Sequence, residues 1–247
     1  MPHDTNLTLV EWENGWWIRE GLRENDTGLI GECWQHDNYR LEFIPPLRTD
    51  EVIVDVGACM GAFTRKAHER NPSARLFAIE AHPDNMACLA KNAGAFATLL
   101  NVALTYEGAV GMTDSIHADN PLSGGNTVLP IAEILADTNP AYERFTTPLP
   151  TITLEELIAQ HNIDYIDVMK MDCEGSEYSI LGKTSSLAKI GIIIGEYHCG
   201  INRFKQLVAD RFPLKDWWHY MWNPSPQHYE NIGYFWLAKR SPPPYAS

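Results

Sequence analysis

The chain has 247 residues, of which 45% are hydrophobic, and its formal net charge is −13 at pH 7. This length is enough for one large domain with a full hydrophobic core, and the negative charge argues against a surface that binds nucleic-acid phosphates. No stretch approaches the roughly 18 apolar residues of a membrane span, and the N-terminus lacks the basic start and apolar core of a signal peptide. We therefore expect a cytoplasmic protein that binds neither nucleic acid nor membranes.

Five cysteines are scattered along the chain without Cys-x-x-Cys spacing. An odd number is a poor disulfide framework, and the spacing does not support a zinc site. We therefore expect free thiols at Cys33, Cys59, Cys88, Cys173 and Cys199.

Residues 1–45 are predicted to form a β-rich N-terminal extension that packs on the main domain. Asn14-Gly15 lies between two apolar runs, which is the strongest short signal for a β-hairpin. Pro45-Pro46 then forms a rigid joint. The aromatic residues of the extension could line a substrate pocket, although such residues more often bury a segment of this kind: Trp12, Trp16, Trp17, Trp34 and Tyr39.

A short apolar run, Val52–Val56, is predicted to be a buried parallel strand because it is rich in β-branched side chains. Asp55 lies near its C-terminal end, where open α/β sheets bind ligands. Gly57 allows a tight turn, and Gly61 allows the backbone to approach a ligand or pack a helix closely. A helix is expected over residues 62–70.

A second strand, residues 75–79, ends at Glu80, 23 residues after Gly57. A carboxylate at an offset of about 20 residues binds ribose hydroxyls in nucleotide-binding βαβ units. The glycine pattern, however, is Gly-x-x-x-Gly and not the Gly-x-Gly-x-x-Gly that holds a pyrophosphate. These features favour a nucleoside ligand without a pyrophosphate, for which S-adenosylmethionine is the common candidate.

The remaining sequence alternates strands and helices, which predicts an α/β fold with a mostly parallel sheet, one antiparallel strand near an edge and helices on both faces. A capping box at Thr153 and Glu156 marks the start of one helix. Residues 114–150 are predicted to be a loop insertion over the site, with a short helix at 132–136. We expect the main domain to span residues 46–240, followed by a tail at 241–247. Further strands are expected at 98–102, 106–112, 165–171, 190–194, 215–222 and 232–239, and further helices at 83–93, 177–181 and 202–212.

Four acidic residues lie at the ends of predicted strands: Asp55, Glu80, Asp172 and Glu196. The carboxyl ends of parallel strands share one edge of a sheet, so these side chains should converge there. If a hydroxyl is the acceptor of a methyl group, a base must take its proton. His198 is the first candidate for this base, and Asp172 is the second.

A metal-assisted alternative uses similar residues. Asp172, Glu196 and His198 could hold a divalent cation that acidifies a hydroxyl. No compact sequence motif supports such a site, so no metal is predicted.

Two segments resemble the FkbM family of S-adenosylmethionine-dependent methyltransferases. They are the glycine loop within residues 52–63 and the Lys-x-Asp-x-Glu-Gly-x-Glu motif within residues 166–181, and residues 101–104 and 195–198 are also similar to family positions. The resemblance covers about residues 50–240. It implies a Rossmann-like class I methyltransferase fold with a seven-stranded sheet, and methylation of a hydroxyl, often on a sugar or a natural-product scaffold.

The resemblance also implies roles for residues. Asp55, Gly57 and Gly61 would contact the methionine end of the cofactor and Glu80 its ribose, while Asn101 and Val102 would flank the adenine. The catalytic residues are expected to be His198, Asp172 and Glu196. The expected cofactor-binding residues are Asp55, Gly57, Ala58, Gly61, Phe63, Glu80, Ala81, Asn85, Asn101, Val102 and Asp172.

Other functions stay open. The chain could be a non-catalytic cofactor-binding partner in a biosynthetic complex, or an N-methyltransferase. The second is weakened because Asn223-Pro-Ser-Pro226 lacks the aromatic residue of the Asn-Pro-Pro-aromatic signature and lies between the last two strands, where a turn is predicted. The acceptor, a small molecule or glycan, is not determined by the sequence, nor is the oligomeric state, although the chain could form a homo-oligomer.

Overall fold

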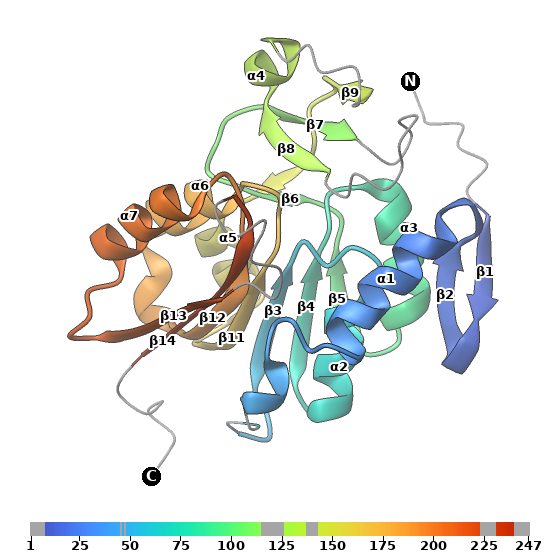
Figure 1. Ribbon diagram of the computed structural model, residues 1–247, viewed down its shortest axis with the longest axis horizontal. Coiled ribbons are helices and arrows are strands. Elements are labelled where there is room, and N and C mark those ends of the chain that lie inside the picture. Colours follow the sequence, from blue (N-terminus) through green and yellow to red (C-terminus); the bar gives the residue numbers. More distant parts are fainter. Residues whose placement is uncertain are drawn as a thin grey trace.

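The computed structural model describes residues 8–44, 46, 48–114, 126–136, 143–222 and 231–239. A seven-stranded sheet runs through the middle of the molecule (Figure 1). Its strands are β3 (Val52–Val56), β4 (Arg75–Ile79), β5 (Ala97–Leu100), β11 (Ile166–Met171), β12 (Ile190–Tyr197), β13 (Trp217–Trp222) and β14 (Gly233–Lys239). They lie in the order β13-β14-β12-β11-β3-β4-β5. Because β14 alone is antiparallel to its neighbours, the expected α/β fold with one antiparallel strand is confirmed.

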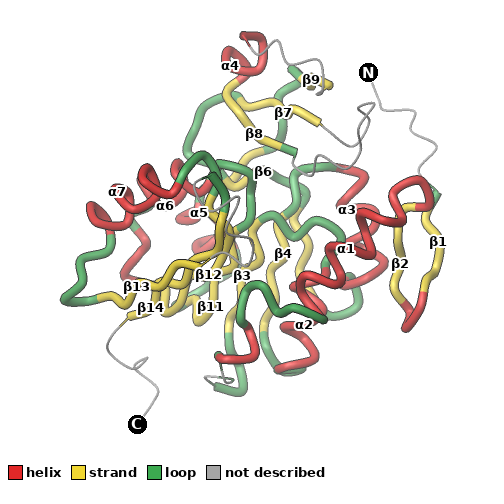
Figure 2. The backbone as a smooth tube through the Cα atoms, in the orientation of Figure 1, coloured by secondary structure: helices red, strands yellow, loops and turns green. Residues whose placement is uncertain are grey.

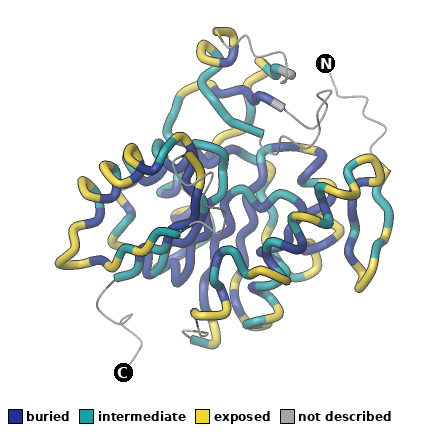
Figure 3. The backbone as a smooth tube through the Cα atoms, viewed as in Figure 1, coloured by how far each residue is buried: buried dark blue, intermediate teal, exposed yellow. Residues whose placement is uncertain are grey.

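Helices cover both faces of the sheet, and Figure 2 shows them in red. Side chains alternate along each strand, so Val52, Val54 and Val56 pack with one set of helices and Ile53 with the other. The first set is α5 (Leu154–Gln160), α6 (Glu177–Lys183) and α7 (Ile201–Arg211), and the second is α1 (Arg23–Trp34), α2 (Ala62–Arg70) and α3 (Pro83–Ala93). Every residue of β3 and β11 is buried (Figure 3), which explains their nearly continuous apolar sequences.

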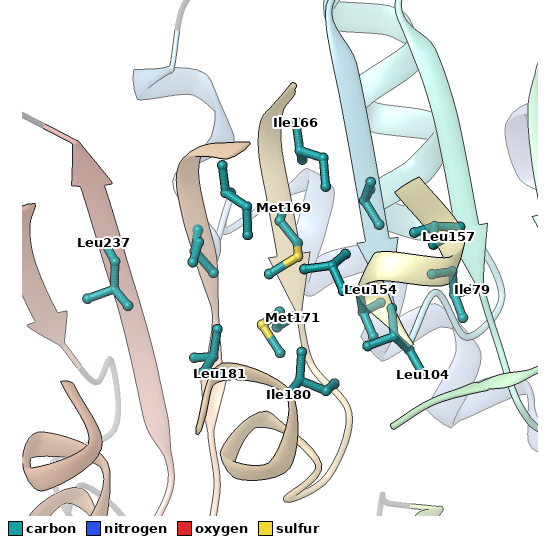
Figure 4. Close-up of a cluster of buried hydrophobic side chains, with 14 of the residues drawn as sticks. Ile79, Leu104, Leu154, Leu157, Ile166, Met169, Met171, Ile180, Leu181 and Leu237 are labelled. Atoms are coloured by element: carbon teal, nitrogen blue, oxygen red, sulfur yellow. The ribbon is translucent and has the colours of Figure 1, made fainter. Parts of the chain in front are cut away.

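One buried cluster holds the end of β11 in place (Figure 4). Met169 and Met171 of β11 share it with Ile180 and Leu181 of α6, and all four side chains are fully buried. Burial of a single side chain of this size stabilises the fold by about 1.5–3 kcal/mol. The packing fixes β11 relative to α6, and therefore also the short segment between them that begins at Asp172.

The N-terminal extension differs from the prediction. The expected hairpin is present, with β1 (Leu9–Trp12) paired to β2 (Trp16–Arg19), but the longest element is the 12-residue helix α1. Describing the extension as β-rich was therefore wrong. The helical pattern is hidden in the sequence because Asp26 is buried in an ion pair and two glycines interrupt α1, so tertiary contacts decide its conformation.

The insertion also differs from the predicted loop. It contains a three-stranded antiparallel sheet of β7 (Val110–Asp114), β8 (Thr127–Pro130) and β9 (Glu143–Phe145), with helix α4 (Ile131–Ala136) after β8. Its two ends meet where β6 (Ala103–Leu104) pairs with β10 (Thr151–Ile152). The pairing of β7 with β9 joins residues about 30 positions apart, which a local sequence pattern does not reveal.

Some predictions lie outside the described residues, namely the loop at 115–125, the turn at 223–226 and the tail at 241–247. All five cysteines are described, and all are free thiols, as expected. Among the described residues, no helix combines the length and apolar character that crossing a membrane requires.

Candidate active site

A pocket lies at the edge of the sheet where β3, β4 and β11 end. Parallel strands bring their carboxyl ends to this edge, which is where open α/β sheets bind ligands. The pocket is lined by Arg19, Leu22, Asn25, Leu29, Val56, Gly57, Cys59, Ile79, Glu80, Ala81, Asn85, Val102, Ala103, Leu104, Asn126, Val128, Asp172, Cys173, Glu174 and Ser176. It therefore draws on the N-terminal extension and the insertion as well as on the main sheet.

The two glycines after β3 have separate roles. Gly57 has a φ of 74°, and a Cβ at this position would lie 1.8 Å from the carbonyl oxygen of Asp172. Only glycine fits there, and its backbone forms part of the pocket. Gly61, with a φ of 93°, precedes α2 and packs against Leu89 of α3, where a Cβ would lie 2.8 Å from the leucine Cδ1. It fixes helix packing and does not line the pocket.

Asp55 lies beneath the glycine loop instead of in the pocket. Its Oδ1 pairs with the Lys170 ammonium at 3.2 Å, and its Oδ2 accepts a hydrogen bond of 2.6 Å from the Thr64 hydroxyl. The Lys170 ammonium also donates to the carbonyl oxygen of Gly57 at 2.7 Å. The side chain of Asp55 therefore supports the loop from below and is not part of the pocket lining.

Glu80 is held with its carboxylate at the pocket. Its Oε2 accepts a hydrogen bond from the backbone N–H of Cys59 at 2.8 Å, and its Oε1 accepts one from the N–H of His82 at 2.7 Å. The amide of Asn101 donates to the carbonyl oxygens of Glu80 and Ala81, so Asn101 fixes the loop and lies outside the pocket lining. These bonds preorganise one carboxylate at the position expected for a ribose.

The structure brings together about half of the expected cofactor residues. Those that line the pocket are Gly57, Glu80, Ala81, Asn85, Val102 and Asp172, whereas Asp55, Ala58, Gly61, Phe63 and Asn101 do not. Within the second group, Asp55 and Asn101 hold the loops through polar contacts, and Gly61 packs against α3. Neighbouring positions were expected to contact the ligand because they share a motif, but successive side chains in a strand or helix point in different directions.

Arg19 was missed by the sequence analysis. It ends β2, is 2% exposed and lines the pocket together with residues of α1. Arginine is rarely buried without a partner, and an arginine at the end of the apolar run Trp16–Ile18 carries no local signal that its partner is present.

Charged groups cluster beside Asp172. The Tyr39 hydroxyl donates to Asp172 Oδ2, while His198 Nε2 lies 3.3 Å from Glu174 Oε2 and 3.9 Å from Asp172 Oδ1. His198 Nδ1 lies 3.2 Å from Oε1 of the fully buried Glu177. Of the three expected catalytic residues, only Asp172 lines the pocket.

The carboxylates of this cluster shift the pKa of His198 and of Glu196. Burial by itself lowers the pKa of His198, but the hydrogen bond and charge of Glu177 with the nearby Glu174 and Asp172 raise it to about 11. Burial, and then the charge of Asp172, raise the pKa of Glu196 to about 9. Both shifts favour the protonated forms of His198 and Glu196.

Asp172, Glu174 and His198 each offer a donor atom, and these atoms lie within 4.8 Å of one another. Two carboxylates and an imidazole are donors that could hold a divalent cation. This set has Glu174 in place of the Glu196 considered in the metal-assisted alternative.

The apolar groups and Glu80 fit an adenosyl ligand. Val102 and Leu104 offer apolar surface, the loop at Gly57 has no room for a side chain, and the carboxylate of Glu80 faces the pocket with both oxygens already oriented. These are the features that a ribose and an adenine require of a binding site.

Comparisons with known proteins also indicate a methyltransferase. The family model for the methyltransferase FkbM domain matches residues 55–232. The hexuronic acid methyltransferase AglP of Haloferax volcanii is 26% identical over 198 residues, which cover 79% of this chain and 71% of that protein. The 31-O-demethyl-FK506 methyltransferase FkbM of Streptomyces tacrolimicus is 26% identical over 187 residues, which cover 66% and 71%.

A solved structure of the plantazolicin methyltransferase BpumL in complex with SAH is similar, with a TM-score of 0.47 and 11% identity, covering 90% of this chain and 88% of that one. The family match includes the glycine loop, Glu80 and the charged cluster after β11, and it spans well over half of the chain. The chain belongs to the FkbM family of S-adenosylmethionine-dependent methyltransferases.

Proposed function

We propose that this enzyme transfers the methyl group of S-adenosylmethionine to a hydroxyl oxygen of a sugar or natural-product acceptor. The observation that carries the proposal is a single pocket with Glu80 and Asp172 in its lining. The names of the two relatives support the acceptor class, because one acts on a hexuronic acid and the other on an O-demethyl natural product.

The residues of the pocket would contact three different parts of the cofactor. Glu80 and Asn85 would hold the ribose, Val102 and Leu104 the adenine, and the backbone at Gly57 the methionine end. The bound cofactor supplies an activated methyl group, and its transfer breaks the C–S bond, leaves the electron pair on sulfur and forms a C–O bond to the acceptor. The protein mainly aligns the two reactants and excludes water.

Asp172 is the residue that would take the proton of the acceptor hydroxyl. It lines the pocket at the end of β11, and the Tyr39 hydroxyl fixes its Oδ2, which leaves Oδ1 as the acceptor atom. The proton passes to Asp172 as the oxygen gains the methyl group, so the charges balance. His198, whose Nδ1 faces Glu177, lies beside the same oxygen, with its Nε2 3.9 Å from Asp172 Oδ1.

The test is methyl transfer from labelled S-adenosylmethionine to a panel of glycosides, uronic acids and polyhydroxylated natural products. A product that carries the label on an oxygen supports the proposal, and Asp172→Asn should abolish it while binding of S-adenosylhomocysteine persists. A label found on nitrogen would indicate an N-methyltransferase. Cofactor binding without any labelled product across the panel and in host extract would indicate a non-catalytic binding partner and contradict the proposal.

A further inference from the structure

Arg19 reaches the cofactor pocket from outside the region that the family model matches, residues 55–232. Its side chain lies between Asp26 of α1 and Asn85 of α3, and all three residues are buried, with 2%, 0% and 5% of their surfaces exposed. A fully buried arginine is unusual. Packing alone therefore does not explain why this charged side chain lies at the pocket.

Asp26 fixes the guanidinium group. Arg19 Nη2 lies 2.5 Å from Asp26 Oδ1, and Nε donates to both oxygens of the same carboxylate at 3.1 and 3.2 Å. The backbone N–H of Arg19 also donates to Asp26 Oδ2 at 2.8 Å. This bidentate pairing leaves Nη1 pointing in a single direction.

That direction is toward Asn85. Arg19 Nη1 donates to Asn85 Oδ1, and because a guanidinium group can only donate, it determines which end of the amide faces it. The Asn85 Nδ2 is consequently turned to Oε1 of Glu80, at 3.4 Å. Asn85 and Glu80 both line the pocket, so Arg19 fixes the donor and acceptor pattern that a ligand meets there.

The residues on either side of Arg19 in the N-terminal extension also lie at or next to the pocket. Leu22, Asn25 and Leu29 line the pocket beside Arg19. The amide of Asn92 on α3 accepts from the N–H of Trp17 at 2.8 Å and donates to its carbonyl oxygen at 2.9 Å. The end of β2 and the start of α1 therefore form one wall of the cofactor pocket.

We propose that Arg19 is a positioning residue for cofactor specificity, which fixes the amide of Asn85 beside Glu80 so that the two side chains together face the ribose 2′-hydroxyl of the cofactor. The proposal depends only on the family's cofactor and holds whichever acceptor is methylated. It assigns to the N-terminal extension a role in recognising the nucleoside part of the cofactor.

The experiment is calorimetric titration of the full chain with S-adenosylhomocysteine and with its analogue that lacks the ribose 2′-hydroxyl. Arg19→Lys keeps a positive charge near Asp26 but lacks the fork that also reaches Asn85. The double variant Arg19→Met/Asp26→Leu replaces the buried ion pair with apolar side chains, a change that folds often tolerate. For both variants we expect the Kd of S-adenosylhomocysteine to rise about tenfold or more, with less than about threefold change for the deoxy analogue.

The ratio of the two Kd values separates positioning from a general structural effect, which would weaken both ligands alike. Arg65→Ala is the matched control, because Arg65 donates to the carbonyl oxygens of Asn14 and Gly15 in the same extension and does not line the pocket. It should leave the ratio unchanged. If the ratio of the two Kd values in Arg19→Lys equals that of the unmodified protein, the proposal is overturned. This holds whether both affinities are unchanged or both fall by the same factor. If the double variant fails to fold, Arg19→Lys alone decides.

Discussion

The hydroxyl of Tyr39 donates a hydrogen bond of 2.5 Å to Oδ2 of Asp172, joining the N-terminal extension to the residue that follows β11. Burial, with the negative charge of Asp172 as the next cause, raises the pKa of Tyr39 well above its usual value. The phenol therefore keeps its proton and acts as a permanent donor. This contact fixes Oδ2 of Asp172, and Tyr39 makes no bond to Oδ1.

Replacing Tyr39 with phenylalanine should lower the turnover number about tenfold to a hundredfold, because Asp172, the proposed base, loses the hydrogen bond that fixes its orientation. The Kd of S-adenosylhomocysteine should stay within about twofold, since Tyr39 does not line the pocket. Steady-state kinetics and calorimetry measure the two quantities. Tyr234→Phe is the control, because its ring lies 5.6 Å from that of Tyr39 while its hydroxyl bonds to Asn38; equal effects of the two variants would argue against the orienting role.

Lys170→Met should destabilise the fold by about 3–5 kcal/mol, because it leaves the buried carboxylate of Asp55 without its cation. For a chain of this length the melting temperature should fall by about 2–4 °C per kcal/mol. Replacing both residues, as in Lys170→Met/Asp55→Leu, should recover most of this loss. A double variant no more stable than Lys170→Met would show that the ion pair is not the cause.

Gly57→Ala should abolish binding of S-adenosylhomocysteine, because the new Cβ would lie 1.8 Å from the carbonyl oxygen of Asp172 and the residue has a φ of 74°. The loop must move, and the pocket moves with it. Gly108→Ala is the matched control, since a Cβ there meets nothing within 4 Å and the backbone is not left-handed. Calorimetric titration should show unchanged affinity for that control, and retained binding in Gly57→Ala would contradict the assignment of the loop.

Glu155 should make stability depend on pH below neutrality. Burial by itself raises its pKa, but hydrogen bonds from Tyr106 and Thr184 outweigh burial and lower it from 4.5 to about 2. A pKa that is lower in the folded state stabilises the fold above the unfolded pKa, and this contribution is lost as the pH falls from 4.5 toward 2. Denaturant unfolding of Glu155→Gln should show a loss of about 1 kcal/mol at pH 7 that shrinks across this window.

The control for this measurement is Glu133→Gln, because Glu133 is exposed on α4. Its pH profile should overlay that of the unmodified protein. A Glu155→Gln profile parallel to the unmodified one at every pH would refute the linkage.

Local patterns in the sequence were sufficient to predict the strands of the seven-stranded sheet and most of the helices that cover it. The helices 62–70 and 83–93 were predicted with the observed bounds, and the capping box at Thr153 and Glu156 is formed. These features depend on side-chain periodicity and on residues a few positions apart. The helix α1 was missed because its polar residues and glycines give no such period, and its conformation depends on contacts with the sheet and with Arg19.

The sequence by itself determined the class of the fold, the family, and the positions of Glu80 and Asp172 at strand ends. Only the tertiary structure decided that Asp55 lies beneath the glycine loop, that His198 lies among three carboxylates, and that Arg19 and Tyr39 reach the site. Two of the contacts responsible, Arg19 with Asn85 and Tyr39 with Asp172, join residues 66 and 133 positions apart. The physical reason is that the charge, burial and partners of a side chain are set by neighbours in space, which no local pattern contains.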